Sequence, residues 1–175
     1  MKGFFNNKAQ TLIDLKIKKG KIPKLIKIKF DDYFKNKRKF LNKIGIFFRN
    51  KKIIIRSSFS NEDTNRSSNA GKYESYLNIN SNDFKEIDLK IKRLSKLKNK
   101  IKGENFFIQE MVKDVSFSGV VLTRNLEDYT KCININFFDG KNTEAVTSGR
   151  TETKSIVFFE NDKFVRRQIL EYLQI

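Results

Sequence analysis

The chain has 175 residues, 38% of them hydrophobic and 33% charged, with a formal net charge of +17. This composition can bury a core and excludes a disordered chain. No apolar run approaches the roughly 18 residues that span a bilayer, which excludes a transmembrane protein. The first ten residues contain no long apolar stretch before a small-residue cleavage site, so no secretory leader is expected and a cytoplasmic protein is predicted. The single Cys132 excludes an internal disulfide. Because there is no histidine, the chain carries no phosphohistidine, no histidine acid–base catalyst and no histidine-containing zinc site.

The positive charge is concentrated near the start of the chain. Residues 1–55 hold 17 basic and 3 acidic side chains, whereas residues 103–175 hold 9 and 11. A basic segment attracts phosphate-rich partners such as nucleotides, nucleic acid or anionic lipid. Only 9 of the 37 basic residues are arginine, the better bidentate phosphate ligand. This favours solvated surface lysine over a dedicated nucleic-acid surface, so nucleic acid is not the expected partner.

The first third of the chain predicts helices around one strand. A helix is expected from about Lys8 to Lys18, because Gly20 follows and ends it. Alternating apolar residues then predict a strand over residues 25–30. Asp31 or Asp32 can cap a second helix that runs through Leu41.

The middle third contains the clearest helix. The β-branched run Lys52–Arg56 predicts a buried strand, and the polar stretch Ser57–Lys72 is predicted to lie outside the core. From about Asp83 to Lys102, apolar residues recur every three or four positions, and Asp83 with Glu86 forms a capping-box-like start. Gly103 is expected to end this helix.

Short strands dominate the remainder. They are expected over Phe106–Met111, Gly119–Thr123, Cys132–Phe137 and Ser155–Phe159. Turn residues separate them, so an antiparallel sheet is predicted, followed by a last helix over residues 162–173. The expected fold class is α+β, in one domain of residues 1–175. Its two lobes are a basic one over about 1–104 and a strand-rich one over about 105–175, and a cleft between lobes is a common place for a ligand.

Two segments could bind phosphate. Arg56 ends a predicted buried strand and is followed by two serines, so its guanidinium could hold phosphate oxygens through a rigid fork. Alternatively, Arg56 caps the strand or pairs with Glu62 or Asp63. The loop from Asn69 to Ser75 has one glycine, which would let backbone amides approach a phosphate, and it is not a Walker A loop. By itself this segment favours an ordinary turn.

Four strings, in order, resemble a known family. IIIRSSFSNED, NAGKYESYLNI, IQEMV and FSGVVLTRN are similar to the N-terminal nucleotide-binding region of phosphoenolpyruvate synthases and pyruvate phosphate dikinases, which also occurs in rifampicin phosphotransferases. The resemblance extends from about Asn6 to Phe159. It implies an ATP-grasp-type fold, in which two α+β lobes hold ATP in the groove between them.

The resemblance implies five ATP-binding positions, and no catalytic residue or metal ligand is assigned. These positions are Lys8, Arg56, Gly71, Ser75 and Gln109. Lys8 matches the lysine of an opening Gly-Gly-Lys whose glycines are here replaced by asparagines; the alternative is a surface lysine. Arg56 matches a phosphate-binding arginine, while Gly71 and Ser75 match a phosphate-covering loop. Gln109 matches a hinge-strand glutamine, where adenine is expected against residues 110–112; plain core packing of Met111 and Val112 is the alternative.

The family's later motifs are missing. An acidic Asp-x-Glu strand, a Gln-x-Arg strand, a phosphohistidine domain and a domain that binds pyruvate or phosphoenolpyruvate do not occur in these residues. We therefore expect the front portion of a longer enzyme, or one subunit of a split enzyme, with ATP and Mg²⁺ as cofactors and most Mg²⁺ ligands outside this chain. The missing functions would come from further domains or a separate chain.

The sequence thus predicts an ATP-binding module that holds Mg-ATP for phosphoryl transfer to an acceptor elsewhere. The alternative is a non-catalytic polyanion-binding protein that uses the lysines of residues 16–52 and 85–102. A remnant that keeps the fold and binds neither ligand is a third hypothesis.

Overall fold

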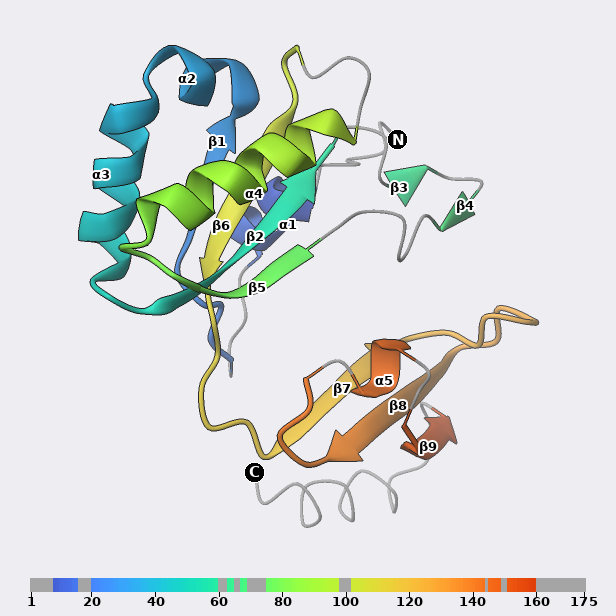
Figure 1. The fold of residues 1–175 in the computed structure, drawn as a ribbon. Coiled ribbons are helices and arrows are strands. Elements are labelled where there is room, and N and C mark those ends of the chain that lie inside the picture. Colours follow the sequence, from blue (N-terminus) through green and yellow to red (C-terminus); the bar gives the residue numbers. More distant parts are fainter. Residues whose placement is uncertain are drawn as a thin grey trace. The chain divides into compact units, whose positions relative to one another are not determined.

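The computed structural model describes residues 8–15, 20–59, 63–64, 67–68, 75–97, 102–143, 145–148 and 151–159. The chain divides into two compact units, Met1–Val112 and Lys113–Ile175. The described part of the first unit combines an antiparallel sheet with several helices, and that of the second combines an antiparallel sheet with one short helix, which confirms the α+β class (Figure 1).

A four-stranded sheet forms the centre of the first unit. Its order is β1 (Leu25–Lys29), β6 (Asn105–Glu110), β2 (Lys52–Ser58) and β5 (Ser75–Asn80), and all neighbours are antiparallel. A separate pair of short strands, β3 (Asp63–Thr64) and β4 (Ser67–Ser68), precedes β5.

The position of β6 corrects the expected division of the chain. The sequence placed this segment in a second lobe that begins near residue 105, but β6 pairs with both β1 and β2. The boundary therefore falls after Val112. Local sequence could not show this, because the partners of β6 lie far from it along the chain.

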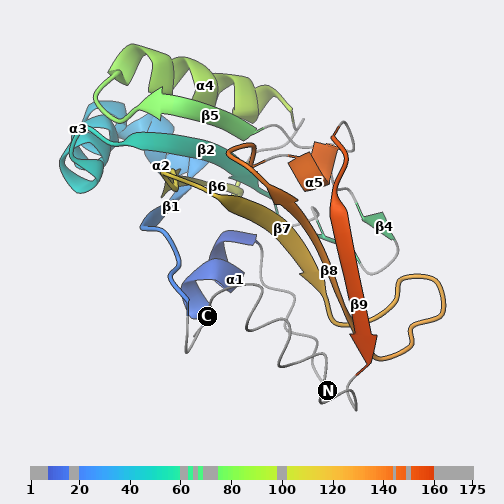
Figure 2. The same ribbon diagram turned by 90° about the horizontal axis from the view of Figure 1, so that it is seen from below.

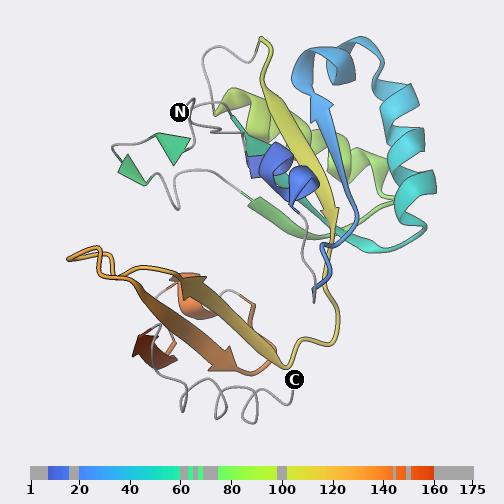
Figure 3. The same cartoon turned by 180° about the vertical axis from the view of Figure 1, so that it is seen from behind.

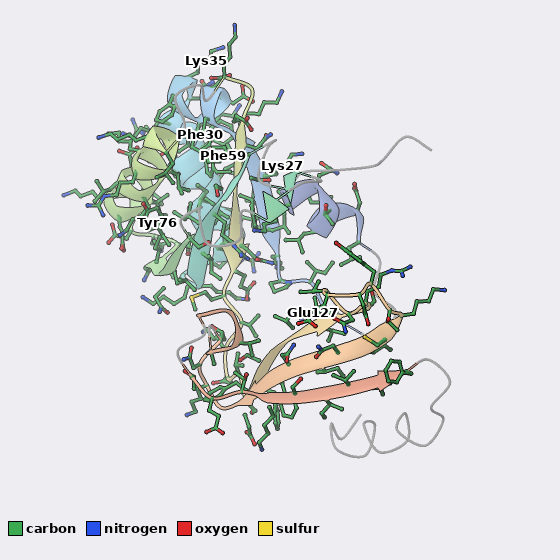
Figure 4. The ribbon with its side chains drawn as sticks, turned by 90° about the vertical axis from the view of Figure 1, so that its right-hand side faces the viewer. Lys27, Phe30, Lys35, Phe59, Tyr76 and Glu127 are labelled. Atoms are coloured by element: carbon green, nitrogen blue, oxygen red, sulfur yellow. The ribbon has the colours of Figure 1, made fainter. Side chains whose placement is uncertain are left out.

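Helices lie on both faces of this sheet. They are α1 (Lys8–Asp14), α2 (Phe30–Lys35), α3 (Lys37–Phe48) and α4 (Phe84–Lys96). Figure 2 shows α3 and α4 on one face and α1 on the other. The hydrophobic core lies between the sheet and α2, α3 and α4. In that core the Phe30 ring lies 4.9 Å from the Phe106 ring and 5.9 Å from the Phe59 ring, centroid to centroid (Figure 4).

Two local predictions differ from the structure. The helix expected to end at Leu41 is two helices separated at Asn36, whose N–H points to the carbonyls of Asp32 and Tyr33. Asp31 does not cap it; its carboxylate accepts a hydrogen bond from the Gly103 N–H at 3.0 Å. Gly103 has a φ of 76°, a left-handed conformation that favours glycine, whereas α4 ends at Lys96 with Leu97 as its C-cap.

The start of the polar stretch was also predicted wrongly. Ser57, Ser58 and Phe59 are buried, because β2 continues past Arg56 into the sheet. By contrast, the capping of α4 is confirmed: the Asp83 carboxylate accepts a hydrogen bond from the Glu86 N–H at 2.9 Å. The expected continuation of this helix through residues 98–101 lies outside the described residues.

The second unit contains a three-stranded sheet. Strands β7 (Phe117–Leu122), β8 (Cys132–Asp139) and β9 (Lys154–Phe159) are consecutive and antiparallel, as expected, and α5 (Ala145–Ser148) accompanies them. The final helix predicted over residues 162–173 lies outside the described residues. Across both units, none of the described helices combines the length and apolar character needed to cross a membrane.

Candidate functional site

Alternation along β2 gives the sheet of the first unit two different faces. Ile53 and Ile55 belong to the core beneath the helices. Because successive side chains of a strand point to opposite faces, Arg56 lies on the other face, the one that carries α1. We call this second surface the α1 face (Figure 3).

Arg56 is the centre of a row across this face. It is paired with Ser75 on β5 and with Phe107 on β6. Directly paired residues of antiparallel strands project to the same face, so the three side chains are neighbours. The Arg56 guanidinium carbon lies 5.7 Å from the centroid of the buried Phe107 ring, and this contact holds the arginine along the sheet.

Helix α1 is attached at the same end of the sheet. The buried Ala9 N–H donates a hydrogen bond to Ser58 Oγ at 3.1 Å, and Lys27 Nζ donates to Gln10 Oε1 at 2.6 Å (Figure 4). Lys8 immediately precedes Ala9 and is exposed. The tertiary structure therefore brings Lys8 to the end of β2 that carries Arg56.

Gln109 lies farther along the same face. It is buried and pairs with Ile54 on β2 and with Leu25 on β1. Since β6 is antiparallel to β2, Gln109 is two residues along its strand from Phe107, toward the opposite end from Ser58. Arg56 and Ser75, predicted to bind phosphate, and Gln109, predicted to bind adenine, therefore occupy different positions along one surface.

Residues 110–112 are the hinge segment, against which adenine is expected. The backbone N–H groups of Glu110 and Met111 in this segment are already bonded within the first unit. The Glu110 N–H donates to the Lys24 carbonyl and the Met111 N–H donates to the Lys52 carbonyl, both at 2.9 Å. Met111 Sδ accepts from the Asn78 N–H at 3.1 Å. An adenine edge at this strand would therefore use groups other than these two N–H donors.

Some predicted residues fall outside the described part of the chain. Gly71 is one of them, as are Asn6, Asn7 and Glu62. Conversely, Phe107 was not singled out from the sequence, and Ser58 was noted only as one of the two serines that follow Arg56. Ser58 follows Arg56 by two positions, so a strand predicted two residues longer would have placed both on one face.

The described residues provide no complete metal site. Among them, no three acidic, cysteine or histidine side chains lie close enough to hold a metal ion together. The site instead combines cationic side chains, hydroxyls and an aromatic ring. This combination suits an anionic ligand such as a phosphate group.

A comparison with protein families identifies the family of the chain from its first half. The family model of the pyruvate phosphate dikinase AMP/ATP-binding domain matches residues 6–93, which include Lys8, Arg56, Gly71 and Ser75. No curated protein matches the chain. The match covers half of the sequence, and the chain therefore belongs to the family of AMP/ATP-binding N-terminal domains of enzymes that use phosphoenolpyruvate.

Proposed function

We propose that the first unit binds Mg-ATP on its α1 face, so that a phosphoryl group passes to an acceptor on another domain or chain. One observation carries the proposal: Arg56 and Ser75 are cross-strand partners, and the hydrogen bond between Ala9 and Ser58 brings the helix that begins at Lys8 to the same end of the sheet. Two cations near a hydroxyl can stabilise the charge that develops on a transferred phosphoryl group. Gly71 would contribute backbone amides that cover the phosphates.

The adenine would lie toward Gln109. The buried Gln109 amide lies beyond Phe107 when the face is followed from Arg56, so a nucleotide could extend along β6 with its phosphates at the Arg56 end. An amide can both donate to and accept from the edge of a purine. We extend the proposal to an ATP-grasp fold, in which the first unit is the lobe that carries these residues.

The other requirements of the reaction lie outside this surface. The described residues do not fit a complete Mg²⁺ site, so Mg²⁺ would be held mainly by the nucleotide's phosphates and by carboxylates from elsewhere. A chain without histidine needs an acceptor from a separate domain or chain, such as a phosphohistidine domain with a partner that binds pyruvate or phosphoenolpyruvate. We propose that this takes place in the cytoplasm.

Calorimetric titration with Mg-ATP tests the proposal. Arg56→Ala should raise the Kd at least ~10-fold, because charge-assisted hydrogen bonds to phosphate are lost. Arg38→Ala is the matched control, since this exposed arginine belongs to α3 on the opposite face. A folded Arg56→Ala protein that binds Mg-ATP as tightly as the wild type would refute the assignment.

Salt dependence distinguishes Mg-ATP binding from the alternative of polyanion binding. The exposed surfaces of α3 and α4 are rich in basic side chains, including Lys39, Lys43 and Lys85. If nucleic acid is the ligand, log Kd should rise by about 0.9 per neutralised phosphate for each tenfold rise in salt, and Arg56→Ala should have little effect. Binding of Mg-ATP should change much less with salt and depend strongly on Arg56.

A further inference from the structure

A hollow of the first unit lies beside α4. It has a volume of about 400 Å³ and lies at the outer edge of the first unit's sheet, where β5 meets the end of α4. Its described lining consists of Ser75, Tyr76, Arg93, Lys96 and Leu97. This volume falls in the range of pockets that hold small ligands.

The sheet itself separates this hollow from Arg56. Tyr76 pairs with the core residue Ile55, and it packs against the core beneath the helices. Tyr76 and Arg56 therefore lie on opposite faces of the sheet. Ser75, at the start of the edge strand, is the one predicted ATP-binding residue among the described residues that line the hollow.

Three cations on α4 run past the hollow. Lys90, Arg93 and Lys96 are spaced three apart, which places them on one side of a helix. Lys90 Nζ lies 4.8 Å from the centroid of the Tyr76 ring. The ion pairs formed within the described part of the chain use other lysines, so no carboxylate there neutralises these three. The positive potential of this edge is therefore available to an anion.

Two of the described residues that line the hollow present aromatic or aliphatic surface. Tyr76 is half-buried and offers an aromatic ring, and Leu97 is 42% exposed although it is a large hydrophobic residue. An aromatic ring and a leucine side chain favour a planar ring, whereas a guanidinium and an ammonium group favour phosphate. One ligand that carries both groups would match both sets of residues.

We propose that this hollow is a second binding site, which takes a small phosphorylated molecule with a planar ring, such as a nucleoside monophosphate. The ring packs against Tyr76 and Leu97, while Arg93 and Lys96 hold the phosphate. The site rests on the hollow alone and does not depend on ATP binding at Arg56.

Titration of the uniformly ¹⁵N-labelled full chain with AMP, followed by NMR, tests the proposal residue by residue. Amide shifts at Tyr76 and Leu97 report the second site, and shifts at Arg56 and Phe107 report the α1 face. The double variant Arg93→Ala/Lys96→Ala should weaken the first response at least ~10-fold and leave the second unchanged. Arg56→Ala should weaken the response of the α1 face and leave the response at Tyr76 and Leu97 unchanged. The two proposed sites can therefore be disproved independently.

The matched control removes the same charge elsewhere. Lys39→Ala/Lys43→Ala changes two exposed residues of α3 and should leave the response at Tyr76 unchanged. If the Arg93/Lys96 double variant does not fold, the single variants Arg93→Gln and Lys96→Gln keep the aliphatic stems. Each should weaken AMP binding, measured from the amide shift at Tyr76, at least ~3-fold.

Four results would overturn the second site. The first is that AMP causes no amide shifts at Tyr76 and Leu97, and the second is that the α3 control variant weakens AMP binding as much as the Arg93/Lys96 double variant does. The third is that Arg56→Ala abolishes the shifts at both sites. The fourth is that a single-stranded oligonucleotide, whose affinity rises with its length, displaces AMP. The last result would assign this edge to nucleic acid.

Discussion

Arg56 and Ser75 are direct cross-strand partners at the end of β2 and the start of β5. The segment between them returns the chain to the same end of the sheet, so a guanidinium and a hydroxyl from separate motifs share one surface. Ser58 adds α1 to this arrangement through its hydrogen bond to Ala9. The candidate ATP-phosphate site is therefore assembled by strand pairing.

Substitution of Arg56 by lysine should separate the effect of charge from that of shape. Arg56→Lys keeps one positive charge but loses the planar fork that can bind two phosphate oxygens at once. We expect Mg-ATP affinity between those of the wild type and Arg56→Ala, measured by calorimetry. Affinity equal to the wild type would show that the fork is not used.

Removal of the Ser58 hydroxyl should loosen α1. Ser58→Ala leaves the buried Ala9 N–H without its acceptor, which should lower the free energy of unfolding by about 1–3 kcal/mol, measured by urea denaturation. Ser81→Ala is the matched control: Ser81 is also buried, but its hydroxyl has no hydrogen-bond partner in the described part of the chain. We expect that change to be neutral or stabilising. Equal losses in both variants would contradict the role of Ser58.

Asp88 connects three elements of the core side. Its carboxylate accepts a hydrogen bond from the buried Tyr33 hydroxyl at 3.0 Å and forms ion pairs with Lys37 at 2.6 Å and Lys92 at 3.0 Å. Partial burial acts to raise the pKa of Asp88, but the hydrogen bonds from Lys37, Lys92 and Tyr33 hold this pKa below its ordinary value of 3.8. Burial, followed by the hydrogen bond to Asp88, raises the pKa of Tyr33.

Stability in acid should therefore depend on Asp88. Because the pKa of Asp88 is lower in the folded chain, the unfolded chain binds more protons between the two pKa values, and stability rises with pH there. The contribution is present above about pH 4 and is lost as the pH falls through the folded pKa. We expect Asp88→Asn to lower the Tm at pH 6 and to reduce the fall in Tm between pH 6 and pH 3. The exposed Asp32→Asn is the control, and an unchanged pH profile in Asp88→Asn would disprove this account.

The start of α4 should depend on the Asp83 side chain. Asp83→Ala removes the acceptor for the Glu86 N–H and should lower the free energy of unfolding by about 0.5–2 kcal/mol. Asp83→Asn keeps a side-chain oxygen and should retain most of the stability. Chemical denaturation compares the two variants. If they lose the same amount, the cap is not what stabilises this end of the helix.

Local patterns predicted individual elements well. The alternation of the second unit predicted three consecutive antiparallel strands, and Asp83 with Glu86 marked the start of α4. Single-residue signals were weaker: Asp31 resembled a helix cap, yet it binds the Gly103 N–H instead. A carboxylate beside a helix start can bind any nearby donor, and the competing donor here came from a distant part of the chain.

The candidate site also depends partly on local sequence and partly on contacts between residues that are distant along the chain. The sequence alone determined the residue types, the α+β class and the family resemblance that singled out Lys8, Arg56 and Ser75, because these depend on local order along the chain. Only the tertiary structure decided that β6 pairs between β1 and β2, that Phe107 supports Arg56, and that Ser58 holds the start of α1. Strand pairing joins residues that are far apart in sequence, and its free energy comes from contacts that exist only after the chain has folded.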